Sequence, residues 1–146
     1  MAEACVSLTL EQVDAEIAVT AQEIARRSLL PFTSYTKTDY LVNWHHAVVA
    51  EALDRVLAGQ CRRLMIFEPP QNGKSEQVSR RFPAYALGRR PDLRIIACSY
   101  NMSLAQDMSR DVQKVMSTAE YATLFPGTRL AEPRDSEKRK IGRAHV

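Results

Sequence analysis

The sequence predicts an α/β fold, in which three layers form around a mainly parallel sheet and an N-terminal helical segment precedes them. Two short apolar runs, residues 64–67 and 93–98, are typical of strands that are buried on both faces of such a sheet. Each run is followed by an expected helix, over residues 74–87 and 103–116. This alternation of strand and helix indicates an open sheet with right-handed crossover connections.

The N-terminal segment is expected to form one helix over residues 9–30. Thr9 suits its start because Gln12 follows three residues later, and Pro31 is expected to end it. The apolar residues of this segment recur at helical spacing: Val13, Ile17, Ala21, Ile24 and Ala25. Residues 32–40, which are rich in Ser, Thr and Tyr, are expected to form an ordered loop.

The remaining chain is expected to begin with a helix over residues 43–57, and Gly59 suits its C-terminal end. Pro83 lies inside the helix over residues 74–87, so a kink or a break is expected there. We therefore divide the chain into three parts. They are an N-terminal helix and loop (1–40), a truncated nucleotide-binding domain (41–132) and a charged tail (133–146).

The composition is that of an ordinary globular chain, since 45% of the 146 residues are hydrophobic and 25% are charged. No run of about 18 apolar residues is present, which argues against a membrane-spanning helix. Residues 1–5 lack the basic start of a secretory signal. The cysteines, Cys5, Cys61 and Cys98, form no metal-binding pattern and indicate reduced cytosolic thiols.

The net charge of +3 permits a nucleic-acid partner but does not require one. Arginines cluster at residues 62–63, 80–81, 89–90 and 134–143. They are either solvated helix ends and loops or contacts to nucleic-acid phosphates, and charge alone does not separate these alternatives.

Residues 68–75 have the features of a phosphate-binding loop. Such a loop needs backbone N–H groups at the start of a helix, a Lys for the β- and γ-phosphates, and a hydroxyl for Mg²⁺. Gly73, Lys74 and Ser75 supply these in order, between an expected strand and an expected helix. The usual first glycine is replaced by Glu68, so the loop is a variant form. The alternative is an ordinary helix start with Ser75 in its first turn.

The sequence of this loop resembles that of the large terminase subunits of tailed phages. Residues 67–76, Phe-Glu-Pro-Pro-Gln-Asn-Gly-Lys-Ser-Glu, are similar to the Pro-Pro-Arg-His-Gly-Lys-Ser-Glu loop of that family. The resemblance extends from Trp44 to Pro126. It includes Trp44-His45-His46, Arg62-Arg63, Phe82-Pro83-Ala84-Tyr85, Leu87-Gly88-Arg89, Ile95-Ile96-Ala97-Cys98-Ser99-Tyr100, Leu104-Ala105 and Ser109-Arg110-Asp111-Val112.

This resemblance implies a partial P-loop NTPase, namely the ATPase of a motor that moves viral DNA into a procapsid and carries a nuclease in a second domain. ATP and Mg²⁺ are the implied cofactors. Lys74 would contact the β- and γ-phosphates, Ser75 would bind Mg²⁺, and the N–H groups of Asn72, Gly73 and Lys74 would line the cradle. Gln71 stands where this subfamily commonly has Arg, which puts transition-state stabilisation from that position in doubt.

The implied partners are double-stranded DNA, the small terminase subunit and the portal protein. The implied location is the cytoplasm of a bacterial host, with the gene carried by a phage or prophage.

Three further positions are candidates for the site. Trp44 either stacks on the adenine or packs and caps the helix together with His45 and His46. Glu76 either belongs to the nucleotide site or is a helix-start charge that the helix dipole favours. Residues 99–101 would lie where the second strand ends, at the edge where open sheets bind ligands.

The chain lacks the second acidic motif that such ATPases need, a buried strand that ends in Asp and Glu. Asp107 and Asp111 lie on an expected helix, and Asp135 and Glu137 follow no strand. We therefore expect a fragment that binds ATP weakly and hydrolyses little or none. The alternative is a stand-alone nucleotide- or DNA-binding module without turnover, and a helicase or AAA+ type of P-loop protein fits less well.

Residues 141–146 resemble one reading frame of a common sequencing adapter. We expect that the gene is cut near Lys140 and that these residues are an artefact; the alternative is a natural basic tail. The encoding DNA distinguishes the two.

Overall fold

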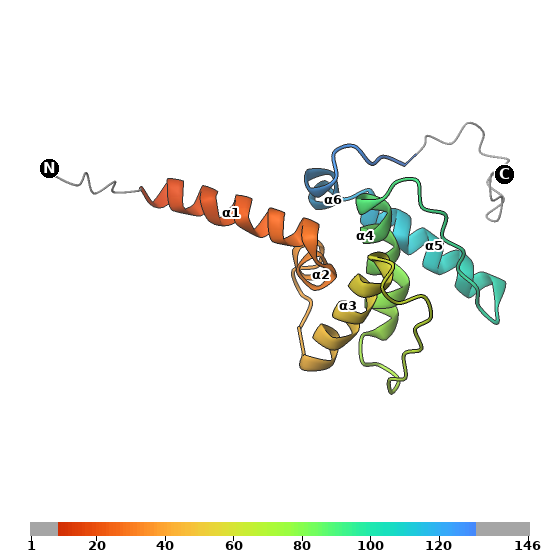
Figure 1. Ribbon diagram of the computed structural model, residues 1–146. Helices are drawn as coiled ribbons and strands as arrows, with labels where there is room; N and C mark the ends of the chain where they lie inside the picture. The colour runs from red at the N-terminus through yellow and green to blue at the C-terminus, as the bar shows by residue number, and fades with distance from the viewer. Residues whose placement is uncertain (1–8, 131–146) are drawn as a thin grey trace, which may run out of the picture.

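Within residues 9–130, which the computed structural model describes, the chain is a bundle of packed helices with extended connections (Figure 1). The helices are α1 (Leu10–Arg27), α2 (Leu29–Thr36), α3 (Trp44–Leu57), the π-helical segment η1 (Ser75–Arg81), α4 (Phe82–Arg89), α5 (Met102–Met116) and α6 (Ala119–Leu124). The charged tail 133–146, its adapter-like end and the N-terminal residues 1–5 lie outside the described residues.

The prediction of a three-layer, mainly parallel sheet is wrong, because residues 9–130 contain no strand. The two expected strands, residues 64–67 and 93–98, run as connections without regular hydrogen-bonded partners. They are also exposed rather than buried: Phe67 is 84% exposed and Ile96 is 81% exposed. An apolar run indicates residues that are suited to burial. A strand also needs a neighbouring strand to pair with its backbone N–H and C=O groups.

The first helix begins as the sequence predicts and ends earlier. The Thr9 hydroxyl accepts a hydrogen bond from the Gln12 backbone N–H, and the Gln12 side chain accepts one from the Thr9 N–H. The chain then turns at Ser28, and α2 starts at Leu29. Pro31 therefore lies in the first turn of α2, where its missing N–H has no intrahelical acceptor to lose. The expected loop over residues 32–40 is helical as far as Thr36, so that prediction is wrong in its first half.

The core lies where α2, α3, α4 and α6 meet, and its centre is a group of four aromatic side chains. Phe32 contacts Tyr85, Tyr121 and Phe125, with ring centroids 5.3, 6.2 and 6.0 Å away. The buried apolar residues are Ala25, Leu29, Phe32, Val49, Ala50, Leu53, Ala84, Tyr85, Val115, Tyr121, Leu124 and Phe125. Helix packed on helix thus replaces the expected helix on sheet.

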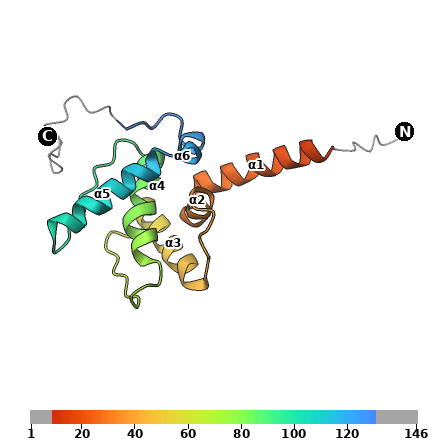
Figure 2. The ribbon, with the colours of Figure 1, turned by 180° about the vertical axis from the view of Figure 1, so that it is seen from behind.

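α1 projects away from this bundle, so its N-terminal half contacts little else (Figure 1). Residues 10–21 are all exposed, including Ile17 of the predicted apolar face. Seen from behind, α5 runs along η1 and α4, and α6 returns to the C-terminal end of α1 (Figure 2). There the Arg26 side chain donates to the backbone oxygens of Leu124 and Thr123.

The helix that follows the candidate loop runs through Pro83 by a change of helical register. Residues 75–81 are π-helical, and the Phe82 N–H donates to the oxygen of Gln77, five residues earlier. Pro83 then stands at the second position of α4, where a proline is tolerated. The expected kink or break thus takes the form of a π-helical segment. Its i, i+5 hydrogen bonds end just before Pro83, which has no N–H to donate.

The two other predicted helices are confirmed. α3 begins at Trp44 after the capping residue Asn43, and Gly59 follows its end with a φ of +76°. α5 begins at Met102 after the capping residue Asn101. Over residues 9–130, no helix combines the length and apolar character needed to cross a membrane.

Candidate functional site

The candidate loop joins the extended run 64–67 to η1 and contains two residues with positive φ. Gly73 has a φ of +77° and Gln71 a φ of +66°. A Cβ atom on Gly73 would stand 2.7 Å from Nε2 of His46, so both the backbone angle and the available space require glycine there. Gln71 is held in a conformation that few residues other than glycine adopt, which is a common feature of binding loops.

Lys74 and Ser75 lie at the junction of the loop with the helix. The Lys74 ammonium donates to the backbone oxygen of Glu68, 3.3 Å away, so its side chain reaches back across the loop. Ser75 is the first residue of η1, and its side chain is exposed. The first N–H groups of a helix have no intrahelical acceptor. A cation, a hydroxyl and free N–H groups therefore meet at one place, which is the donor set that a phosphate needs.

The N-terminal end of α3 packs against this loop through two histidines. Nε2 of His46 lies 3.1 Å from the backbone oxygen of Asn72, and Nε2 of His45 lies 3.3 Å from the same oxygen. Nδ1 of His46 accepts a hydrogen bond from the Asn43 N–H at 3.1 Å. The imidazole of His46 is thus held on both sides, and only 7% of the residue is exposed.

Gln77 ties the first turns of η1 to the same end of α3. Its side-chain N–H donates to the His46 backbone oxygen at 2.9 Å, and the residue is 1% exposed. A buried amide with a satisfied hydrogen bond fixes the position of one element relative to the other.

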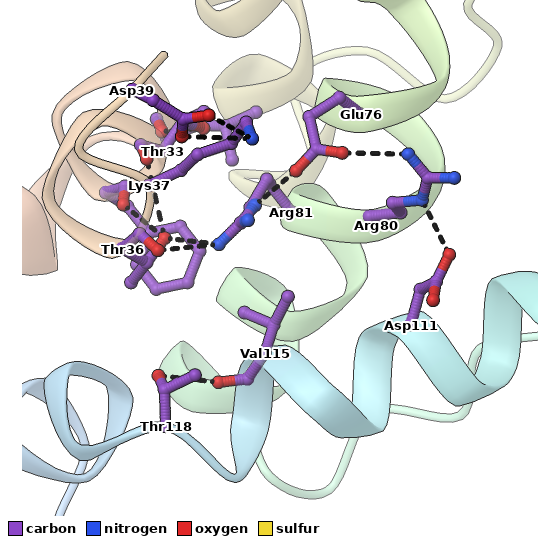
Figure 3. A network of polar contacts seen from close by, with 12 residues as sticks. Thr33, Thr36, Lys37, Asp39, Glu76, Arg80, Arg81, Asp111, Val115 and Thr118 are labelled. Carbon is purple, nitrogen blue, oxygen red and sulfur yellow. Dashed lines mark hydrogen bonds and ion pairs between the residues drawn. The ribbon is translucent and has the colours of Figure 1, made fainter.

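Glu76 is held in a network of ion pairs (Figure 3). Its carboxylate accepts from Arg81 at 2.7 Å and from Arg80 at 2.9 Å. Burial alone raises the pKa of Glu76, but the hydrogen bonds from Arg81 and Arg80 outweigh it, so its pKa lies below the ordinary value. Arg80 also binds Asp111 of α5 at 2.8 Å, and Arg81 donates to the Thr36 hydroxyl of α2 at 2.9 Å. The network therefore connects the helix after the loop to α2 and α5.

Tyr40 and Glu68 each bury a polar atom near the loop. Among the described residues, neither the Tyr40 hydroxyl nor Oε2 of Glu68 has a hydrogen-bond partner. Burial, together with the negative charges of Glu76 and Glu68, raises the pKa of Tyr40 to about 12. The Tyr40 ring packs against His46 with the centroids 4.9 Å apart.

A cleft of about 300 Å³ lies beside the loop, between α3 and the extended run 64–67. Trp44 lies at this cleft with 76% of its surface exposed, and its ring meets that of His45 edge-on. The lining is mostly apolar and consists of Trp44, His45, Val48, Val49, Ala52, Leu64, Met65, Ile66, Phe67 and Glu68.

The other candidate positions lie outside this arrangement. Tyr100 is 93% exposed, and the Asn101 side chain accepts from the Ser103 N–H to cap α5. Asp107 and Asp111 lie on α5 and form ion pairs with Arg110 and Arg80. Within residues 9–130, no three His, Cys, Asp or Glu side chains form a metal-binding group.

Two of the three arginine clusters in residues 9–130, those at 80–81 and 89–90, bind other groups of the chain. Arg80 and Arg81 bind Glu76, as described above. Arg89 donates to the backbone oxygens of Arg26 and Arg27 at the end of α1, and Arg90 donates to that of Leu57 at the end of α3. These contacts are those of helix-end arginines, which stabilise exposed carbonyl groups.

The structure thus places Gln71, Asn72, Gly73, Lys74 and Ser75 in one loop, with Trp44 at the cleft beside it and Glu76 turned into the ion-pair network. Sequence reasoning missed Tyr40 and Gln77, and it noted Arg80 and Arg81 only as a charge cluster. The ion pair of Glu76 with Arg80 had a signal, because the two residues are four positions apart on an expected helix. No protein-family model matches the chain, nor does any curated protein or solved structure.

Proposed function

We propose that this chain carries the phosphate-binding loop of an ATP-driven DNA-packaging motor, the large terminase subunit of a tailed phage. One observation carries the proposal. Gly73, Lys74 and Ser75 stand at the start of a helix, with Gly73 in the left-handed region and Lys74 reaching across the loop. The resemblance of the flanking motifs supports the assignment to a packaging motor, with double-stranded DNA, the small terminase subunit and the portal protein as partners and the host cytoplasm as the location.

In this proposal the β- and γ-phosphates of ATP bind to the Lys74 ammonium and to the N–H groups of Asn72, Gly73 and Lys74. The Ser75 hydroxyl would hold Mg²⁺, which neutralises negative charge on the phosphates when it is bound. Lys74 has to exchange the Glu68 backbone oxygen for the phosphate oxygens. Because this exchange lowers the net free energy gained on binding, weak affinity for ATP is expected.

The adenine would lie in the cleft beside Trp44. A volume of about 300 Å³ is at the lower end of small-molecule sites, and the lining is mostly apolar, as a base requires. The exposed indole of Trp44 offers a face for stacking.

We expect binding without appreciable hydrolysis. Glu76 is engaged by Arg80 and Arg81 and so is not free to orient an attacking water, and Asp107 and Asp111 lie on α5 rather than in the loop. Gln71 also supplies no positive charge for the transition state. The parent motor would obtain its acidic motif and its nuclease from other segments.

Isothermal titration calorimetry with ATP and with AMP, each in the presence of Mg²⁺, tests the proposal. ATP is expected to bind and AMP to bind at least about tenfold more weakly, since AMP lacks the β- and γ-phosphates. Lys74→Ala should abolish the difference, whereas Lys114→Ala, an exposed lysine on α5, should leave it unchanged. Equal binding of both nucleotides would contradict the proposal. Steady ATP turnover that Lys74→Ala abolishes would contradict only the expectation of binding without hydrolysis.

A further inference from the structure

We propose that His46 is a positioning residue, whose Nε2–H group holds the peptide between Asn72 and Gly73 in the orientation that aims the Gly73 N–H into the phosphate cradle. This inference rests on the proposed function of the loop and adds a role for a residue outside it. Three contacts carry it: Asn43 to Nδ1, Nε2 to Asn72, and the close approach of Gly73.

The partners of the two ring nitrogens define the tautomer. Nδ1 faces the Asn43 N–H, which can only donate, so Nδ1 carries the lone pair. The ring proton of the neutral imidazole is then on Nε2, and Nε2 donates to the Asn72 oxygen. The helix cap of α3 thus selects the tautomer that binds the loop.

Because a peptide group is planar, this hydrogen bond to the Asn72 oxygen also fixes the direction of the Gly73 N–H. The Asn72 oxygen and the Gly73 N–H belong to one planar trans peptide, in which C=O and N–H point in opposite directions. Because His46 holds the oxygen on the side of α3, the Gly73 N–H points to the opposite side. A peptide flipped the other way would present an oxygen to the phosphates, and like charges would repel there.

The surroundings of His46 keep its ring in place. Its backbone oxygen accepts from the buried Gln77 side chain, and the Tyr40 ring packs against its imidazole. His45 brings a second ring nitrogen to the same oxygen, at the longer distance of 3.3 Å. Gly73 permits the approach, because any Cβ there would meet Nε2 at 2.7 Å.

Two substitutions distinguish the role of Nε2 of His46 from that of Nδ1. In His46→Gln the side-chain amide can place an N–H near Nε2 and so keep the bond to Asn72. In His46→Asn the shorter amide can replace only Nδ1, so the helix cap is kept and the bond to the loop is lost. Glu51→Gln, a change at an exposed position of α3, is the control.

Calorimetric titration of the full chain with ATP and Mg²⁺ gives the main readout. We expect His46→Asn to bind about tenfold more weakly than the wild type, and His46→Gln and Glu51→Gln to stay within about threefold. The Gly73 amide resonance should move in His46→Asn and stay near its wild-type position in His46→Gln. Equal losses in both histidine variants would show that the ring acts only by packing, and would overturn the inference.

Nitrogen NMR of the wild-type imidazole tests the same inference without any substitution. The proton is expected on Nε2 of His46; a proton on Nδ1 would overturn the inference even if a variant fails to fold. If the wild type binds no ATP, the proposed function fails, while the tautomer and the Gly73 resonance still decide whether His46 orients the loop.

Discussion

Gly73 lies against the imidazole of His46 so closely that a Cβ on the glycine would stand 2.7 Å from Nε2. This contact joins the candidate loop to the first turn of α3. Gly59 has nearly the same φ, +76° against +77° for Gly73, but nothing lies within 4 Å of the Cβ that it would carry. A side chain at either position would therefore strain the backbone, but only at position 73 would it also collide with a neighbouring residue.

Gly73→Ala should destabilise the fold more than Gly59→Ala. The positive φ costs each alanine about 1 kcal/mol, and the conflict with His46 adds about 1–3 kcal/mol at position 73 alone. Urea unfolding followed by circular dichroism measures both variants. Equal losses of stability would show that the loop moves away from His46 freely.

Tyr40→Phe should leave the free energy of unfolding unchanged or raise it by up to about 1 kcal/mol. The Tyr40 hydroxyl is buried and has no hydrogen-bond partner among the described residues, so its removal loses no contact. Tyr121→Phe is the matched control, because the Tyr121 hydroxyl donates to the Ala84 oxygen at 3.0 Å. That variant should lose about 1 kcal/mol. A larger loss in Tyr40→Phe than in Tyr121→Phe would mean that Tyr40 has a partner in solution.

The stability contributed by Glu76 should disappear in acid. Because the folded-state pKa of Glu76 lies below its ordinary value of 4.5, its ion pairs stabilise the fold above that pH and lose this effect as the pH falls through the folded-state value. Wild type should therefore exceed Glu76→Gln in stability at about pH 7, and the difference should shrink at acidic pH, as the pH falls below 4.5. Urea unfolding at neutral and acidic pH measures this. Glu16→Gln on exposed α1 should show no such change, and a constant difference for Glu76→Gln would contradict the account.

The exposed apolar runs should make the chain self-associate. Phe67 and Ile96 are 84% and 81% exposed, and large exposed apolar side chains promote association. Phe67→Ser with Ile96→Ser should lower the apparent mass in concentrated solution by analytical ultracentrifugation. Asp14→Ser, at an exposed charged position of α1, should have little effect. If the double variant associates as strongly as the wild type, the two runs are not the contact surface.

Helices α1, α3 and α5 were predictable because the signals for them are local, whereas α2 was expected in part to be a loop and α6 was not predicted. Thr9 with Gln12 places a cap next to the backbone groups that it satisfies. The sheet failed because strand pairing is not local: residues 64–67 and 93–98 have the composition of buried strands, but no neighbour in the described chain pairs with them. Pro31 was misread for a related reason, since a proline ends one helix and suits the first turn of another equally well.

The residues of the candidate site that are adjacent in sequence could be predicted, but its contacts between distant residues could not. Gly73, Lys74 and Ser75 are adjacent in sequence, so a motif suffices to find them. The contact of His46 with Asn72 and that of Arg81 with Thr36 join residues 26 and 45 positions apart, and only the packing of α3, η1 and α2 brings them together. Glu76 shows the converse, because its place in the motif suggested the nucleotide while its side chain binds two arginines.

The central claim is that residues 71–75 hold the phosphates of ATP, and titration of the isotope-labelled chain with ATP and Mg²⁺ tests it most directly. The amide resonances of Asn72, Gly73, Lys74 and Ser75 are expected to move together and to saturate, while that of Gly59 stays in place. The same titration of Lys74→Ala should leave all of them unmoved. Saturable shifts elsewhere in the chain, with these four amides unchanged, would contradict the account.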